Sequence, residues 1–340
     1  MTLRHLFSWK SLFYDAALPL LRWLGPARGD AALGRIGRAV AAVRPGMARR
    51  VAPRLAEARA ALGADWDLAA IGPAVVANIP RYLARDYPLD SDDDARALAR
   101  FDVDGASHLD DALARGRGVV LVGSHLGAHV AGLHWLHRRG VPVRMLVQRP
   151  GHVSRSLRAR FDGEAEGPHP QAKMSLRRGL PTREAADRLL RAHAALRDGY
   201  AVYLNGDIPW PGRNARPGRL LGPTRPFLSV WADLAVLSRS PAVFVSCTHA
   251  PGGRYALEFA PPIDLAPGDE PRAVAAYFAN LEAAIARDPA EAVAHLTWPC
   301  FGPGTPTMPC DRARSRRGTS HTLPSRATRD RPSSWSALDS

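Results

Sequence analysis

The chain has few cysteines, almost no lysine and no long apolar run. Its 340 residues contain three cysteines, Cys247, Cys300 and Cys310, which lack the spacing of a metal site and do not suggest a disulfide framework. A reducing, cytoplasmic setting is therefore expected. No run of 18 or more apolar residues occurs, so no clear membrane-spanning helix is predicted, and no convincing signal-peptide pattern is seen.

The positive charge is carried almost entirely by arginine. Lys10 and Lys173 are the only lysines among 46 basic residues, and the formal net charge is +14. A GC-rich genome is the simplest explanation of this bias. The excess charge still favours anionic partners, such as acidic lipid, nucleic acid or an acidic carrier protein. Because the arginines are spread along the chain without a recognised nucleic-acid motif, we expect no nucleic-acid partner.

The composition divides the chain into three regions. Residues 1–100 are predicted as a helical N-terminal region, with helices broken at Pro45, Pro53, Pro73 and Pro80. Residues 101–300 are predicted as an α/β domain. Residues 301–340 are rich in Pro, Ser, Thr and Arg, which is typical of a disordered basic tail.

The first segment, Leu3 to Leu24, combines Leu, Phe and Trp with the interruptions Lys10, Pro19 and Arg22. This mixture indicates a segment that lies in a membrane interface, with aromatic anchors and basic residues at headgroup level. Residues 1–60 hold eleven Lys and Arg against three Asp and Glu, which supports this interpretation. The alternative is an N-terminal helix that packs on the domain.

From Phe101 onward, strand-like and helix-like patterns alternate. This order predicts βαβ units and a central, mostly parallel or mixed sheet flanked by helices. The expected strands are 118–123, 142–148, 200–204 and 242–248, and the expected helices are 126–138, 182–198, 226–239 and 271–287.

A candidate catalytic residue follows the first of these strands. Val119 to Val122 has the length and β-branching of a buried strand, and Gly123 and Ser124 form a corner that precedes His125. Ligands bind beyond the carboxyl ends of strands in open α/β sheets. His125 is therefore a candidate general base.

Other candidate site residues follow the same logic. Arg149 ends a predicted strand, and Arg158 and Arg160 lie just beyond it, where guanidinium groups suit oxyanion recognition. Asp207 follows the strand 200–204. Gly222 lies in a Gly/Pro loop, 220–227, that leads toward an apolar helix.

Two other kinds of site are disfavoured. His125, His129, His134 and His137 suggest zinc, but the Glu of the metalloprotease signature is missing, so we expect no metal. His134 and His137 are most simply solvated residues near a helix end. Ser124 lacks the Gly-x-Ser-x-Gly spacing of a serine-hydrolase nucleophile and suits a tight corner.

Several stretches together resemble a known family. "GSHLG" is followed by "VQRP", "LRDGYAVYLNGD" and "LLGPTRPF", and then by "SPAVFVSCTHAPGGRYALEFAPPIDL" and "YFANLEAAIARDPAEAV". In this order, over roughly residues 10–298, the chain resembles the late acyltransferases of lipid A biosynthesis. That family is a branch of the lysophospholipid acyltransferase superfamily.

The resemblance implies an α/β acyltransferase fold at the cytoplasmic face of the inner membrane, peripherally bound. It implies transfer of a fatty acyl chain from an acyl carrier protein or acyl-CoA thioester to a hydroxyl of a membrane glycolipid or lysolipid, an anionic acceptor. It implies no cofactor. Carried over, His125 is the base, Arg149 contacts a phosphate or sugar, and Gly222 lies on the loop that lines the acyl or acceptor site.

The chain departs from the family at one catalytic position. Members have His-x4-Asp/Glu, in which the acid orients and stabilises the imidazole. Here the acid position holds Val130. Asp207, at a neighbouring strand end, is the most plausible substitute. The alternative is a catalytically weak or inactive homologue that binds lipid or a partner enzyme.

Overall fold

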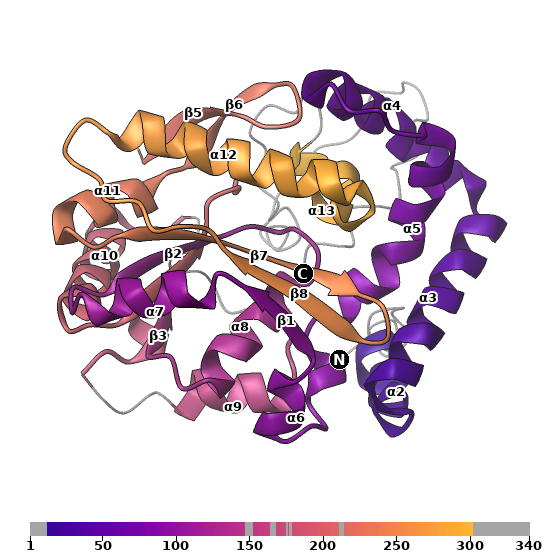
Figure 1. Ribbon diagram of the computed structural model, residues 1–340, viewed down its shortest axis with the longest axis horizontal. Coiled ribbons are helices and arrows are strands. Elements are labelled where there is room, and N and C mark those ends of the chain that lie inside the picture. The colour runs from indigo at the N-terminus through magenta and orange to yellow at the C-terminus, as the bar shows by residue number, and fades with distance from the viewer. Residues whose placement is uncertain are drawn as a thin grey trace, which may run out of the picture.

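The computed structural model describes residues 12–146, 152–163, 168–174, 176, 179–210 and 214–301. Within them a six-stranded mixed sheet is flanked by helices, and a group of N-terminal helices packs at one side of the sheet (Figure 1). The predicted α/β class, with a helical N-terminal region, is confirmed. Residues 3–11 of the predicted interfacial segment and 302–340 of the predicted tail lie outside the described residues.

The N-terminal helices precede the first strand. They are η2 (Leu12–Ala17), α2 (Leu18–Trp23), α3 (Gly25–Val43), α4 (Pro45–Leu62), α5 (Leu68–Ala84), η3 (Tyr87–Leu89) and α6 (Asp94–Leu98). Of the four prolines expected to break helices, only Pro45 marks a boundary, whereas Pro53 lies inside α4 and Pro73 and Pro80 lie inside α5. A proline inside a helix cannot donate the usual backbone hydrogen bond. In α5 the interior packing of Val75, Val76 and Pro80 offsets this loss. Among all the residues that the structure describes, no helix is both long and apolar enough to cross a bilayer.

The α/β part begins at residue 101. Its elements are β1 (Phe101–Asp104), α7 (Ala106–Ala114), β2 (Val119–Gly123), α8 (His129–Arg138), β3 (Val143–Met145), α9 (Arg155–Gly163), η4 (Gln171–Lys173), α10 (Thr182–Arg197), β4 (Ala201–Asn205), β5 (Ala215–Arg219), β6 (Thr224–Leu228), α11 (Val230–Ser238), β7 (Ala242–Ala250), β8 (Arg254–Phe259), α12 (Glu270–Arg287), η5 (Pro289–Glu291), α13 (Val293–Thr297) and η6 (Pro299–Phe301).

The strand order in the main sheet is β1-β8-β7-β2-β4-β3. Strands β7, β2, β4 and β3 run parallel, while β8 is antiparallel to β7 and parallel to β1. After β2 the chain passes to the edge strand β3, returns to β4 beside β2, and later reaches β7 on the other side of β2. The carboxyl end of β2 is therefore a switch point, where ligands bind in open α/β sheets.

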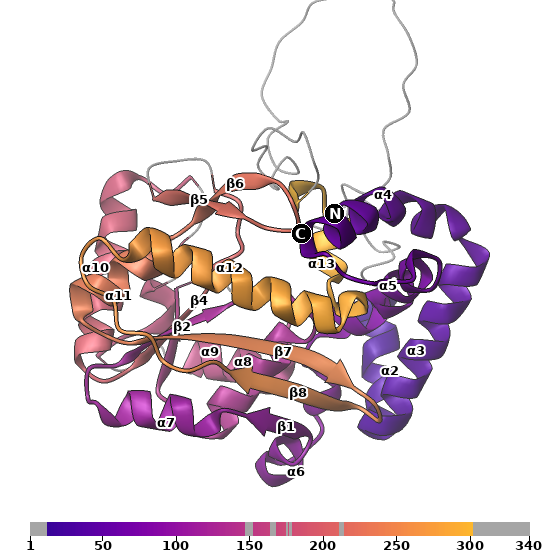
Figure 2. The ribbon, with the colours of Figure 1, turned by 45° about the horizontal axis from the view of Figure 1, so that its top comes forward.

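Successive residues of β2 pack into two separate cores. Val120 and Val122 face the layer that contains α4, α5 and α10–α13, whereas Val119 and Leu121 face the layer of α7 and α8. Figure 2 shows α12 over one face of the sheet and α7 over the other. Because both faces are covered, the strand is apolar throughout, which is why the run was recognisable in the sequence.

The predicted elements differ from the structure in specific places. Residues 226–228 belong to β6 rather than to the first turn of a helix, since they pair with β5 in a two-stranded antiparallel sheet. Strands β1, β5, β6 and β8 were not among the expected strands. Strand β5, "ARPGR", contains Pro217 and Gly218, both poor strand formers, so its pairing depends on β6 rather than on its own residues.

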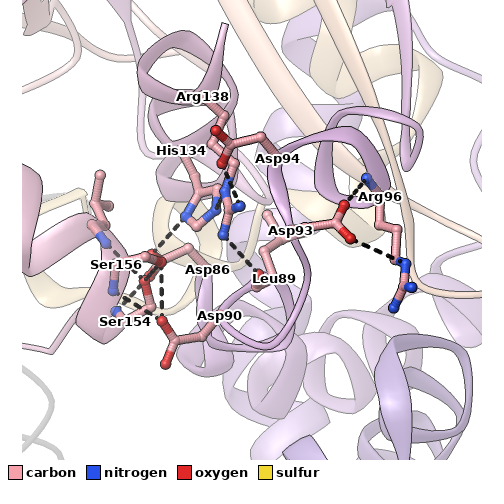
Figure 3. A network of polar contacts seen from close by, with 11 residues as sticks. Asp86, Leu89, Asp90, Asp93, Asp94, Arg96, His134, Arg138, Ser154 and Ser156 are labelled. Carbon is pink, nitrogen blue, oxygen red and sulfur yellow. Dashed lines mark hydrogen bonds and ion pairs between the residues drawn. The ribbon is translucent and has the colours of Figure 1, made fainter. Parts of the chain in front are cut away.

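His134 and His137 are buried, which corrects the expectation that they are solvated. Figure 3 shows the network around His134. His134 Nδ1 lies 3.3 Å from Asp86 Oδ2, and Arg138 Nε donates to His134 Nε2 at 2.6 Å. Asp86 Oδ1 accepts from Ser154 N at 3.1 Å. These contacts stabilise α8, which follows the His125 corner, against the segments before α6 and α9.

Candidate active site

The corner after β2 is sterically tight. A Cβ added at Gly123 would lie 2.0 Å from the Tyr203 hydroxyl, so only glycine fits there. The Gly123 carbonyl accepts from Gly206 N at 2.9 Å and from the Tyr277 hydroxyl at 2.8 Å. Ser124 is buried, and its Oγ accepts from Leu126 N at 3.3 Å. Contacts with Tyr203, Gly206 and Tyr277 thus fix the end of β2. The next side chain, His125, therefore has a defined position.

His125 and Asp207 meet because β2 and β4 are parallel neighbours. Gly123 pairs with Asn205, so the residues two positions further along each strand lie side by side. His125 Nδ1 is 2.9 Å from Asp207 Oδ1, and the His125 backbone N–H donates to Asp207 Oδ2 at 2.7 Å. The structure therefore places beside His125 the carboxylate proposed to replace the missing acid. Its catalytic role stays a prediction.

Asp207 is ionised although it is fully buried. Burial alone raises the pKa of this carboxyl. Attraction to His125, hydrogen bonds from His125 and His295 and attraction to His295 outweigh that effect and hold the pKa well below its ordinary value. A charged carboxylate at this position can stabilise a positively charged imidazole.

The hydrogen bonds around His125 define its tautomer. Because Asp207 only accepts, Nδ1 carries the proton and donates to it. On the other side, Asn205 Nδ2 lies 3.3 Å from His125 Nε2, and the Tyr203 hydroxyl donates to Asn205 Oδ1 at 2.8 Å. Nε2 is therefore the acceptor nitrogen. The His125 side chain is 19% exposed, which suits a base that must reach a substrate.

A C-terminal segment, residues 289–301, covers the other side of this pair. His295 Nε2 lies 2.8 Å from Asp207 Oδ2, and the Trp298 ring centroid lies 5.4 Å from that of His125. Arg54 of α4 donates to the carbonyl of Trp298 at 2.7 Å, and Arg225 of β6 donates to that of Cys300 at 3.2 Å. The site is thus assembled from β2, β4 and a segment far along the chain.

The same segment also contacts the corner itself. Gly127 N donates to the Glu291 carbonyl at 3.1 Å, and the Glu291 carboxylate accepts from His249 Nδ1 at 2.8 Å and from Asn78 Nδ2 at 3.0 Å. Sequence reasoning missed His295, Glu291 and Trp298. Glu291 lies in the stretch "YFANLEAAIARDPAEAV" but does not stand out within it, and the partners of all three residues are remote in sequence, so no local signal identifies their contacts.

Of the other four predicted residues, the structure fully describes Arg158 and Gly222. Arg158 is exposed on α9. Burial raises the pKa of Tyr87, and the positive charge of Arg158 opposes that rise. Arg149 lies outside the described residues, as does the side chain of Arg160. Gly222, with φ +112°, forms the turn between β5 and β6, and a Cβ there would lie 3.4 Å from Glu57 Cγ. The binding roles of these four residues stay predictions.

The loop that contains Gly222 borders a small pocket that is partly open to solvent. Apolar side chains form most of its lining, and Arg54, Glu57 and Arg225 supply charge (the other lining residues are Leu220, Leu221, Pro223, Phe227, His295, Leu296 and Phe301). Because His295 belongs both to this lining and to the Asp207 contacts, the pocket adjoins the pair of His125 and Asp207.

His129 and Val130 cannot replace the missing acid. The half-buried His129 ring lies 5.3 Å from the His125 ring, measured between centroids, and desolvation together with repulsion from His125 holds the pKa of His129 well below its ordinary value. It is therefore neutral. Val130 is 1% exposed on α8 and packs in the core between the sheet and that helix. Within the described residues, no group of three potential metal ligands occurs.

Restoring the family's acid at its usual position is expected to fail. Val130→Glu places a carboxylate in an apolar core, which costs about 3 kcal/mol or more in the free energy of unfolding. We expect no gain in turnover, because His125 Nδ1 already donates its hydrogen bond to Asp207. Urea unfolding and steady-state rates check this, with Val130→Ala as the apolar control. A stable variant with faster turnover would contradict it.

The sheet and the site together define a class: α/β proteins with a His–carboxylate pair at the switch point of the sheet. A match to the family described as "Bacterial lipid A biosynthesis acyltransferase" spans residues 1–293. The chain belongs to this family of acyltransferases. Among curated proteins no sequence match is found.

Proposed function

We propose that this protein transfers a fatty acyl chain from an acyl carrier protein or acyl-CoA thioester to a hydroxyl of a membrane glycolipid or lysolipid. The observation that carries the proposal is the 2.9 Å contact between His125 Nδ1 and Asp207 Oδ1 at the carboxyl ends of β2 and β4. It supplies an oriented base in a chain that lacks the family's usual acid. Membership of an acyltransferase family supports the reaction class.

In the proposed reaction, His125 Nε2 takes the proton of the acceptor hydroxyl as its oxygen attacks the thioester carbonyl carbon. Asp207 stabilises the imidazolium that forms. When the C–S bond breaks, His125 returns the proton to the leaving thiolate, so the histidine ends the cycle unchanged. The acceptor hydroxyl takes the place that Asn205 Nδ2 has beside Nε2 at 3.3 Å.

The charge of the chain supports anionic substrates and donors. A net charge of +14 favours an acidic carrier protein and an anionic lipid by long-range attraction. In this proposal Arg149 binds a phosphate or sugar of the acceptor, Arg158 and Arg160 assist from the following helix, and the Gly222 loop borders the acyl or acceptor site.

We also propose that the protein binds the cytoplasmic face of the inner membrane peripherally, through the N-terminal segment. On α2 and α3, Trp23 is 90% and Val43 80% exposed, and Leu20 and Ile36 on these helices and Leu24 between them are exposed as well. Arg28, Arg35 and Arg38 are exposed on α3, whereas the acidic Asp30 is buried and paired with Arg81. Exposed apolar and aromatic groups among arginines suit an anionic lipid surface.

This surface is tested by sedimentation with phosphatidylglycerol and phosphatidylcholine vesicles. We expect the protein to bind the anionic vesicles, and Trp23→Ala with Val43→Ala to weaken binding at least about fivefold, because apolar area is no longer buried in lipid. Leu190→Ala with Leu237→Ala, at residues 69% and 70% exposed on α10 and α11, is the matched control. Equal binding by both double variants would contradict the assignment.

Acyl transfer itself is tested with purified protein, radiolabelled acyl carrier protein or acyl-CoA thioesters, and a panel of lipid acceptors. We expect label to move to a hydroxyl of at least one anionic glycolipid or lysolipid. Absence of transfer with every pair would contradict the proposal and favour a homologue that binds lipid or a partner enzyme without catalysis.

A further inference from the structure

Asp207 is held between two histidines, only one of which can reach a substrate. His125 donates to Oδ1 from its ring and to Oδ2 from its backbone. His295 is the second ring, with Nε2 2.8 Å from Oδ2. His295 is 2% exposed as a residue and its side chain is fully buried, whereas the His125 side chain is 19% exposed. Any effect of His295 on the reaction must therefore pass through Asp207.

The position of His295 is fixed by several contacts. Its helix, α13, follows Glu291, which is bound to Gly127 and His249, and Arg54 donates to the carbonyls of Leu296 and Trp298. The Phe301 ring lies 4.9 Å from the His295 ring, between centroids. The family match ends at residue 293, short of His295, so family membership assigns this residue no role.

The hydrogen-bond pattern of His295 points toward Asp207 alone. Because Asp207 accepts, Nε2 of His295 carries a proton. Its Nδ1 is buried and has no hydrogen-bond partner among the described residues. Burial of an imidazole with one unpaired nitrogen costs free energy, whereas a phenyl ring of similar shape would leave no polar atom unpaired. The contact with Asp207 is what the imidazole adds.

Three tyrosines and His129 are further ionisable groups near Asp207 among the described residues, and their pKa shifts favour the neutral forms. Burial raises the pKa of Tyr82, Tyr203 and Tyr277, and the negative charge of Asp207 raises it further. Desolvation and repulsion from His125 hold the pKa of His129 well below its ordinary value. The two imidazoles are therefore the groups that compensate the carboxylate, one on each oxygen.

We propose that His295 is a positioning residue: its Nε2–H holds Asp207 Oδ2 so that Oδ1 faces His125 Nδ1 and keeps His125 in the tautomer whose Nε2 accepts a proton. This rests on the proposed acyl transfer for its kinetic part. Without His295, Oδ2 keeps only the backbone donor of His125, the carboxylate can rotate, and the orientation of the imidazole is less defined.

Two variants separate the hydrogen bond from the packing. His295→Gln keeps an N–H donor near the position of Nε2, whereas His295→Phe keeps ring volume and removes the donor. We expect the Phe variant to lower kcat about 30-fold with KM unchanged, and the Gln variant to stay within about threefold of wild type. Equal kcat values for the two variants would overturn the proposal.

An NMR measurement tests the same idea without turnover. In ¹⁵N-histidine-labelled protein, long-range ¹H–¹⁵N spectra distinguish the tautomers of each ring. We expect His295 with its proton on Nε2 and His125 with its proton on Nδ1, and a mixture of His125 tautomers in His295→Phe. If the Phe variant does not fold, the wild-type spectrum still decides, since a His295 proton on Nδ1 overturns the proposal. Absent turnover with the expected tautomers would instead count against acyl transfer.

Discussion

Asp207→Asn is expected to lower kcat about 10⁴-fold while KM changes by no more than a few fold. The amide cannot stabilise an imidazolium, and its N–H group, when turned toward His125, forces the ring into the tautomer whose Nε2 is already protonated. A base in that state cannot accept the proton of the acceptor hydroxyl. Steady-state rates at saturating donor and acceptor measure the effect.

The chain offers a matched control for this substitution. Asp198 also pairs with a histidine, with its Oδ2 2.6 Å from His169 Nε2, but its side chain is 58% exposed and it lies at the start of the turn before β4 rather than at its carboxyl end. Asp198→Asn should leave kcat unchanged. A kcat for Asp207→Asn within about tenfold of wild type would show that another group orients His125.

His125→Ala is expected to lower kcat about 10³-fold, which is the scale of a lost general base. Removal of the ring also leaves Asp207 as a buried carboxylate whose ring partner is His295 alone, so the thermal stability of the variant should be measured alongside its activity. Activity is measured with the donor and acceptor pair that wild type uses best. The partial exposure of His125 predicts that added imidazole restores part of the rate.

His193→Ala is a suitable control, because His193 is a half-buried histidine on α10. It should retain wild-type rates. Unchanged activity in His125→Ala, with wild-type stability, would exclude His125 as the base and with it the proposed mechanism.

Much of the sheet could be predicted because its inner strands are covered on both faces. Val119 to Val122 and the strand before Asp207 form continuous apolar runs, and such runs are recognisable without any neighbour. The hairpin of β5 and β6 could not be recognised in this way. It is held by packing of Phe227 against Phe278 and by the pairing of Arg216 with Asp233, none of which a local pattern contains.

Only part of the candidate site could be predicted from the sequence, for the same reason. A polar residue at the end of an apolar run is a local feature, so the sequence indicates His125 as a base and Asp207 as the substitute for the missing acid. His295 ends no strand, and its importance comes from a contact across 88 residues of chain. Burial of His134 in the Asp86 network was missed for the same cause, since its partner lies on a segment 48 residues earlier.

The sequence by itself determined that a histidine follows a buried strand, that Val130 stands where the family has an acid, and which family the motifs resemble. Only the tertiary structure decided which carboxylate meets that histidine. The reason is that β4 lies directly beside β2 although β3 comes between them along the chain, and strand order and register depend on the packing of the whole sheet. That pairing places Asp207 against His125, and the folding of residues 289–301 over the corner adds His295 behind it.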